Sequence, residues 1–201
     1  MSFIFTLIMF IIFVAVAISL YTEGLWGNAL RLIDVVTSAL LATNFYEPLA
    51  NWLEGQMPSY KYLLDFLSIW VIFGVSMLII RAVSDHLSKV KVRFLKIVDQ
   101  VGSGVLACCV AAVMVSFITM SLHTAPLGKE FMFGGFNSDD DMVLKLAPDR
   151  KWTNFTRMVS NGAFSRSPKN PFDPKKFRFQ YAQRRSEIEK HVKDKQSIRV
   201  N

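Results

Sequence analysis

Three long runs of apolar residues constrain the fold of this chain more than any other feature. Residues 3–21 carry no charge over 19 residues, and residues 101–122 carry none over 22. Residues 63–80 form another apolar run, with Asp65 near its start. A helix of about 20 apolar residues crosses the hydrocarbon core of a bilayer, and backbone groups in lipid must be hydrogen-bonded within their own helix. The sequence therefore predicts an all-α, polytopic membrane protein.

The first of these runs is expected to stay in the protein as an anchor. A cleavable signal peptide has a basic amino-terminal region followed by a shorter apolar core. Only Met1 and Ser2 precede residues 3–21, and neither residue is basic. We therefore interpret this run as a retained transmembrane helix.

A fourth apolar stretch, residues 23–42, contains Arg31 and Asp34, which are unusual within a span. A charged residue costs about 2.5 to 3.5 kcal/mol at the centre of a spanning helix and less near its end. Positions three and four apart share one helix face. The residues spaced in this way form a polar stripe of Gly24, Gly27, Arg31, Asp34 and Ser38. We predict a fourth span over about residues 25–45, with this stripe facing the other helices and Arg31 and Asp34 neutralising each other.

The polar stripe has two interpretations. In the favoured one it is a helix-packing face with an internal ion pair, because no second buried titratable group accompanies that pair. In the other it lines a polar path or a ligand site in a small transporter or channel subunit. Small residues also recur where the last apolar run begins: Gly102 and Gly104 follow Asp99 and let another helix approach closely. This last run is expected to lie inside the bundle.

The connections between the runs differ in character. Residues 44–59 contain two prolines and a glycine and are expected to form a broken, interfacial connection. Apolar residues separate five basic residues between Arg81 and Lys96. This loop either lies flat on anionic lipid or is a solvated basic loop, and the residues leave both interpretations open.

Charge divides the chain into two unlike parts. Residues 1–128 hold 7 Lys and Arg against 7 Asp and Glu, while residues 129–201 hold 16 against 9. The net charge of +7 therefore belongs to the last third. We predict a transmembrane helical domain over residues 1–125 and a partly ordered, hydrophilic, basic tail with short helices over residues 126–201.

The tail is expected to contain some order because ten of its residues are aromatic, too many for a purely solvating segment. Residues 148–162 predict a short helix whose apolar face, including Trp152, docks on the membrane domain, on a partner or on the bilayer. Residues 165–177 contain three prolines and are expected to be extended. Residues 181–195 predict a charged helix.

No catalytic, cofactor-binding or metal site is predicted. The three histidines are far apart in the sequence, and no phosphate-binding loop is present. Cys108 and Cys109 are adjacent within an apolar run and are interpreted as small packing residues. The three aspartates at 139–141 lack the ligand spacing of a calcium loop and are interpreted as a solvated turn.

Two glycine-marked helix starts and the order of the spans carry a family resemblance. The second helix begins with EGLWGNALRL, which contains Gly24 and Gly27, and the last span begins with VDQVGSGVLACCVAAV, which contains Asp99, Gly102 and Gly104. A basic loop follows the third span. With the amino-terminal span, residues 1 to about 125 resemble the colicin V production (CvpA-type) family of bacterial inner-membrane proteins. The resemblance implies a protein needed for producing or exporting a peptide toxin in some bacteria and for envelope integrity, with no established enzymatic reaction.

The basic residues also predict an orientation. The five Lys and Arg between Arg81 and Lys96 place that short loop in the cytoplasm. One span separates this loop from the tail, so we predict that the tail is periplasmic. Long terminal segments cross a membrane largely regardless of their charge, and the 16 basic residues of the tail therefore weigh less than the short loop.

Three functions are weighed for this chain. The favoured one is a non-enzymatic accessory or scaffold in toxin production or export and in envelope integrity. The alternative is a small transporter or channel subunit that uses the polar stripe. A membrane-anchored enzyme with its site in the tail is disfavoured because the tail has one histidine and no cysteine.

The expected partners follow from the membrane location. They are the lipid bilayer and either further copies of this chain or other envelope proteins, with anionic lipid added if the loop over residues 81–96 lies flat on the membrane. Basic and aromatic residues in the tail fit anionic lipid or a protein better than nucleic acid, and no nucleic-acid partner or cofactor is expected.

Overall fold

The fold is described by a computed structural model over residues 3–88, 94–128, 143, 146–160 and 172–200, with the backbone alone for residues 191–200. Across these residues every regular element is a helix, and no strand occurs. The predicted all-α class is therefore confirmed.

Four helices are long and apolar enough to cross a membrane, as the sequence predicts. They are α1 (Phe3–Tyr21), α2 (Gly24–Gln56), α3 (Lys61–Leu87) and α4 (Lys96–Leu122). A short 3₁₀ helix, η1 (Pro58–Tyr60), joins α2 to α3. Two further helices belong to the tail, α6 (Pro148–Ser160) and α7 (Pro174–Val200).

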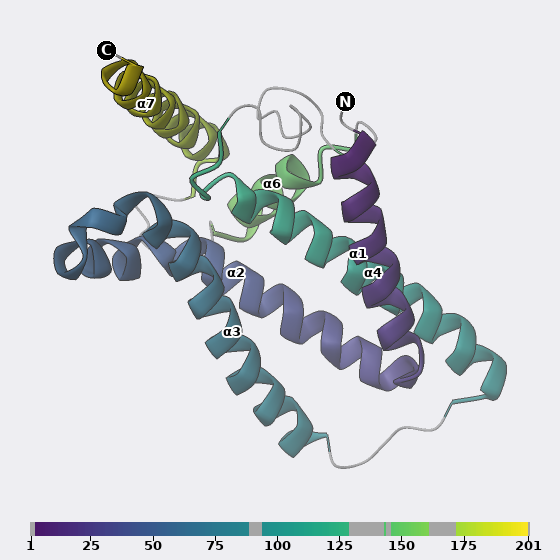
Figure 1. The fold of residues 1–201 in the computed structure, drawn as a ribbon. Coiled ribbons are helices and arrows are strands. Elements are labelled where there is room, and N and C mark those ends of the chain that lie inside the picture. The colour runs from purple at the N-terminus through teal and green to yellow at the C-terminus, as the bar shows by residue number, and fades with distance from the viewer. Residues whose placement is uncertain (1–2, 89–93, 129–142, 144–145, 161–171, 201) are drawn as a thin grey trace.

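The four long helices form a bundle in which α2 and α4 are central (Figure 1). Helix α2 packs against α3 and α4, and α4 packs in addition against α1 and α6. Only one face of α4, the last predicted span, therefore packs inside the bundle. Its other face is exposed and carries Cys108 and Cys109, so the interpretation of these cysteines as packing residues is wrong for contacts within this chain.

Helix α2 runs further than the sequence predicts. It continues through Pro48 and ends at Gln56, whereas residues 44–59 were expected to be broken. Proline has no N–H to donate and normally interrupts a helix, but the turns around it are held by packing because Tyr46 and Ala50 are buried. The break occurs instead at Met57, which leaves helical geometry directly before η1.

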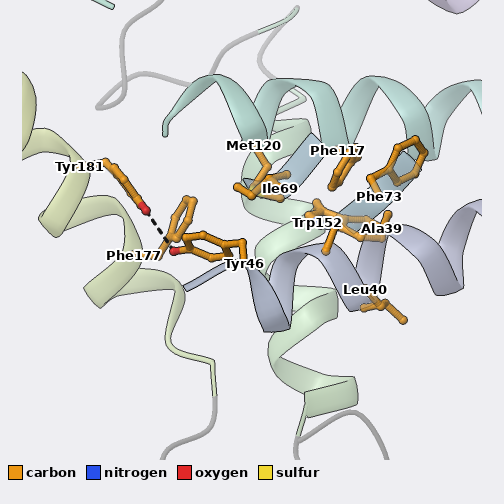
Figure 2. Packing of buried hydrophobic residues seen from close by; sticks show 11 residues of the cluster. Ala39, Leu40, Tyr46, Ile69, Phe73, Phe117, Met120, Trp152, Phe177 and Tyr181 are labelled. Atoms are coloured by element: carbon orange, nitrogen blue, oxygen red, sulfur yellow. Dashed lines mark hydrogen bonds between the residues drawn. The ribbon is translucent and has the colours of Figure 1, made fainter. Parts of the chain in front are cut away.

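One hydrophobic core joins the spans to the tail. Figure 2 shows aromatic residues from α2, α3, α4, α6 and α7 in a single cluster. Phe73 and Phe117 stack with ring centroids 4.8 Å apart, and Phe117 meets Trp152 of α6 edge-on at 6.1 Å. Such aromatic pairs stabilise a core by about 0.5 to 1.5 kcal/mol beyond the burial of their area. Helix α6 and the first turns of α7 are thus packed on the spans, while the rest of α7 extends away from the bundle (Figure 1).

The tail helices follow the prediction in part. Helix α6 confirms the helix predicted over residues 148–162, and its Trp152 is buried against the membrane helices. Residues 165–177 were predicted to be extended, and this prediction is wrong for residues 174–177 because α7 begins at Pro174. Asp173 explains this start: its Oδ1 accepts a hydrogen bond from Lys175 N–H at 2.9 Å, as an N-cap does, with proline in the first turn. Residues 165–171 and 139–141 lie outside the described residues.

The elements define two ends of the bundle (Figure 1). The start of α1, the end of α2, the start of α3, the end of α4 and both tail helices lie at one end, called the tail end here. The α1–α2 turn, the end of α3 and the start of α4 lie at the opposite end, called the glycine end. The boundary predicted at residue 125, between a transmembrane domain and a tail, stays a prediction.

Candidate functional site

At the glycine end, a carboxylate of α4 caps the start of α2. The Oδ1 atom of Asp99 accepts a hydrogen bond from Leu25 N–H at 2.9 Å. Because the first N–H groups of a helix have no partner within it, this bond satisfies one of them and places a negative charge at the positive end of the α2 dipole. Gly24 begins the helix with a φ of +80°, which L side chains rarely adopt, and a Cβ there would lie at an ordinary contact distance of 3.4 Å from Asp99 Oδ1.

Two buried polar side chains tie the α1–α2 turn to α4. The Asn28 amide donates to Leu20 O at 2.9 Å and to Ser103 Oγ at 2.9 Å. Ser103 Oγ in turn donates to Tyr21 O at 2.7 Å. The end of α1, the start of α2 and the start of α4 therefore share one hydrogen-bond network.

Neither Asn28 nor Ser103 was predicted from the sequence to be a site residue. The sequence spacing could have indicated them, because Asn28 follows Gly24 by four residues and Ser103 follows Asp99 by four residues. Residues four apart share a helix face.

The remaining glycines of this end permit close helix contact. A Cβ at Gly102 would lie 2.5 Å from Leu25 Cδ1, and one at Gly104 would lie 3.5 Å from the Tyr21 ring. A Cβ at Gly27 would lie 3.3 Å from Glu23 Cβ. At Gly102, α4 therefore leaves room for the Leu25 side chain at the start of α2, as small residues do in close helix contacts in membranes.

Arg31 and Asp34 do not pair with each other, so this part of the prediction is wrong. Arg31 forms a two-pronged ion pair with Glu23, with Nε to Oε2 at 2.9 Å and Nη2 to Oε1 at 3.2 Å. Asp34 is buried and accepts a hydrogen bond from Ser84 Oγ of α3 at 2.6 Å. The planar guanidinium matches a carboxylate that both N–H groups reach, and Glu23 provides that geometry just before α2.

The structure thus separates the sequence-predicted residues into two groups. Six of them surround the α1–α2 turn and the start of α4: Gly24, Gly27, Arg31, Asp99, Gly102 and Gly104. Asp34 lies apart from these, on the side of α2 that faces α3.

At the tail end, Asp65 of α3 is the centre of a buried cluster. Its Oδ2 accepts hydrogen bonds from Tyr181 O–H at 2.6 Å and from the Arg184 guanidinium, both of α7. The hydroxyl oxygens of Tyr181 and Tyr46 lie 3.1 Å apart, as the dashed line in Figure 2 marks. Burial raises the pKa of the Tyr181 hydroxyl far above its ordinary value, so it stays protonated and donates to Asp65.

A second cluster ties both tail helices to the end of α4. His123 Nε2 lies 3.0 Å from Asp149 Oδ2 of α6, and Arg185 Nη2 of α7 lies 3.2 Å from His123 Nδ1. A guanidinium only donates hydrogen bonds, so Nδ1 must accept and the Nε2–H must donate to Asp149. The imidazole is therefore neutral in this arrangement.

The electrostatic surroundings agree with a neutral imidazole. Burial, the largest cause, lowers the pKa of His123, and the positive charges of Arg185 and Arg178 lower it further, although Asp149 opposes both. For Asp149, burial alone would raise the pKa, but the bonds from His123 and from the Arg150 backbone outweigh it and lower the pKa.

Helix α6 makes two more buried polar contacts with α2. Trp152 Nε1 donates to Thr43 Oγ1 at 3.0 Å, and Ser160 Oγ donates to Asn44 Oδ1 at 2.6 Å. Together with the Asp65 and His123 clusters, these bonds form what we call the tail junction.

Sequence reasoning missed the tail junction. Asp65 was noted only as a charge near the start of a span, and its partners Tyr181 and Arg184 are 116 and 119 residues away. His123 and Asp149 lie on either side of the predicted domain boundary. The available signal was the presence of Asp65 itself, because a buried charge needs a partner somewhere in the chain.

Comparisons with known proteins give one match. The sequence model of the family described as Colicin V production protein matches residues 5–134, which cover α2, α3 and α4 and all of α1 except its first two residues. No curated protein and no solved structure matches the chain significantly.

Proposed function

The chain belongs to the colicin V production protein family, and from this premise we propose that it acts as a non-enzymatic membrane scaffold. In this role it is an accessory of peptide-toxin production or export and of envelope integrity in the bacterial inner membrane. The tail junction is the observation that carries the proposal. It fixes a hydrophilic segment on the spans, so that partners on that side meet a defined surface rather than a loose tail.

The charges in the junction support a lasting attachment. Asp65 is buried and Arg184 is partly buried, so removing Arg184 leaves the Asp65 carboxylate without its ion-pair partner. The Asp65–Arg184 pair therefore disfavours states in which α7 has left the bundle.

The geometry of His123 argues against a catalytic role for the His123–Asp149 pair. A general base needs a ring nitrogen that can reach a substrate proton. Here Nε2 is bonded to Asp149 and Nδ1 to Arg185, and the side chain is buried. The pair is better suited to holding α4, α6 and α7 together.

The transporter or channel alternative rests on the polar stripe. Arg31 is bonded to Glu23 and Asp34 to Ser84, which favours a packing role over a conducting one. Solute and ion flux in liposomes, measured for the native chain and for Arg31→Ala and Asp34→Ala, distinguishes the two functions. Flux that both substitutions abolish would support transport and contradict the scaffold.

The scaffold proposal is tested by complementation in bacteria that lack the protein. We expect Arg184→Gln and a chain ending after Leu122 both to fail to restore toxin production and resistance to envelope stress. Arg157→Gln is the matched control, because Arg157 is exposed on α6 and the charge change is the same. Immunoblots establish that all variants reach the membrane in equal amounts. Full complementation by the shortened chain would overturn the proposal.

We also propose that the tail lies in the periplasm and that the functional unit contains further copies of this chain or other envelope proteins. The basic short loop after α3 supports this orientation through the positive-inside rule. The exposed face of α4 that carries Cys108 and Cys109 offers a surface for another membrane protein, which supports assembly.

A further inference from the structure

Helix α6 lies across the spans rather than along them. Figure 2 shows its ribbon, which carries Trp152, crossing α2 and α4, and it contacts both of these helices. Because α2 and α4 cross the bilayer, a helix at a steep angle to them lies roughly in the plane of the membrane. Helix α6 therefore has one side towards the bundle, one side away from it, and two edges, which face the tail end and the interior of the bilayer.

The contacts of Trp152 give the depth of α6 in the membrane. Trp152 meets Phe117 edge-on and donates to Thr43. Phe117 lies five residues before Leu122, where the uncharged run of α4 ends, and Thr43 lies four residues before the charged Glu47. At 1.5 Å per residue, Trp152 is therefore about 6 to 8 Å inside the tail end of the spans. Helices that lie in a membrane surface are buried to a similar depth, about 5 to 10 Å.

The sequence of α6 places an apolar edge towards the interior of the bilayer. Four residues follow one another at steps of three: Asp149, Trp152, Phe155 and Met158. Each step turns about 60° around the helix in the same direction. The first residue bonds to His123 beyond the end of α4, whereas the second meets Phe117, which lies deeper. Phe155 and Met158 continue this turn away from the tail end, and both are exposed. These two residues form what we call the apolar edge.

The charged residues of α6 agree with this placement. Steps of four residues turn the opposite way, so Arg157, eight residues after Asp149, faces the tail end, and it is exposed. Lys151 lies beside the apolar edge, four residues before Phe155, and is exposed. Its long side chain can extend to the lipid phosphates while its stem stays in an apolar environment. Arg150 is half-buried and has contacts within the chain.

We propose that α6 is an interfacial helix whose apolar edge is inserted among the acyl chains of the phospholipids at the tail end of the bundle. An exposed apolar side chain at this depth faces hydrocarbon rather than water. The amino group of Lys151 favours lipid over an apolar helix of another protein, because lipid supplies phosphates within its reach. The tail is then held twice, by the tail junction to the spans and by this edge to the leaflet. This inference does not depend on the scaffold function.

Contact quenching by lipid tests the proposal on the full-length chain in liposomes. A fluorescent thiol label is placed at Met158→Cys in a chain with Cys108→Ser and Cys109→Ser, and the liposomes contain phosphatidylcholine brominated near the headgroup end of its acyl chains. We expect the label to lose as much fluorescence as one at Leu78→Cys, which is exposed on α3 within a span. Arg157→Cys, the neighbouring position on the opposite edge, is the matched control and should keep its fluorescence.

A second pair of variants needs no label. Met158→Gln places an amide in the hydrocarbon, and we expect it to lower the melting temperature in liposomes. Arg157→Gln has the same new side chain on the opposite edge, and its melting temperature should match that of the native chain.

Three results would overturn the proposal. The first is a label at Met158→Cys that lipid does not quench, which would mean that water or another protein covers the edge. The second is equal quenching at Met158→Cys and Arg157→Cys, which would contradict the assignment of the two edges. The third is an equal melting temperature for the two glutamine variants. Melting temperatures of the cysteine variants before labelling, equal to that of the parent chain, show that each of them is folded.

Discussion

At the scale of single residues, the glycine end depends on a backbone conformation that only one residue adopts at low cost. Gly24 has a φ of +80° and lies under the Asp99 carboxylate that caps α2. Glycine reaches positive φ freely, whereas other L-residues do so at a cost. The family resemblance included Gly24 and Asp99 as sequence features, but only the structure relates them as a helix start and its cap.

We expect Gly24→Ala to destabilise the protein by about 1 to 3 kcal/mol. The added Cβ is strained at this φ, which L side chains rarely adopt, whereas its distance of 3.4 Å to Asp99 Oδ1 is an ordinary contact. The measurement is thermal unfolding in detergent. Gly74→Ala is the control, since nothing lies within 4 Å of a Cβ there and φ is ordinary. A control variant that loses as much stability as Gly24→Ala would contradict the explanation.

The tail junction predicts a dependence of stability on pH. The pKa of His123 is lower in the folded protein than its ordinary value of 6.5. Just below pH 6.5 the imidazole is therefore protonated in the unfolded chain but neutral in the folded protein. The contribution of His123 is therefore complete above pH 6.5 and is lost as the pH falls through 6.5. The pKa of Asp149 is lowered as well, so its contribution persists until the pH falls below its ordinary value of 3.8.

Melting temperatures at pH 7.5 and pH 5.5 test this prediction. We expect the native chain to lose more stability over this interval than His123→Gln, with a slope of at most about 1.4 kcal/mol per pH unit for one proton. His86→Gln is the control, because His86 is exposed. A native chain and a His123→Gln variant with identical pH dependence would refute the assignment.

At the scale of elements, the lengths of the apolar runs predicted where the helices lie but missed two features of α2. The runs at 3–21, 63–80 and 101–122 lie within α1, α3 and α4 because about 20 apolar residues leave few alternatives. The continuation of α2 through Pro48 was missed because local propensity argues for a break, and contacts distant in the sequence override it. The pairing of Arg31 with Glu23 was missed because the carboxylate lies outside the stripe.

We expect Trp152→Ala to release α6 from the spans. Trp152 is 3% exposed, packs on Phe117 and donates to Thr43, and truncating a buried tryptophan costs about 3 to 5 kcal/mol. Hydrogen exchange of the α6 backbone is expected to rise strongly in this variant. Phe155→Ala on the same helix is the control, since Phe155 is 36% exposed, and its exchange is expected to change little. Equal protection in both variants would show that Trp152 does not hold α6.

At the scale of the whole molecule, four spans place the amino terminus and the tail on the same side of the membrane. Both lie at the tail end of the bundle (Figure 1). Paired cytoplasmic and periplasmic reporters fused before residue 3 and after Asn201 are expected to report one shared side, which we predict to be the periplasm. Reporters on opposite sides would contradict the four-span arrangement, and a shared cytoplasmic side would contradict only the orientation.

The central claim is that the tail is part of one packed unit with the spans, and a cross-link in intact membranes tests it most directly. Asn44→Cys on α2 and Ser160→Cys on α6, in a chain with Cys108→Ser and Cys109→Ser, replace side chains whose oxygens lie 2.6 Å apart. A thiol cross-linker that only joins neighbouring side chains should couple this pair rapidly and almost completely. The pair Asn44→Cys and Asn154→Cys, with Asn154 exposed on the same helix, should stay uncoupled. Equal, slow coupling of both pairs would mean that the tail is not docked.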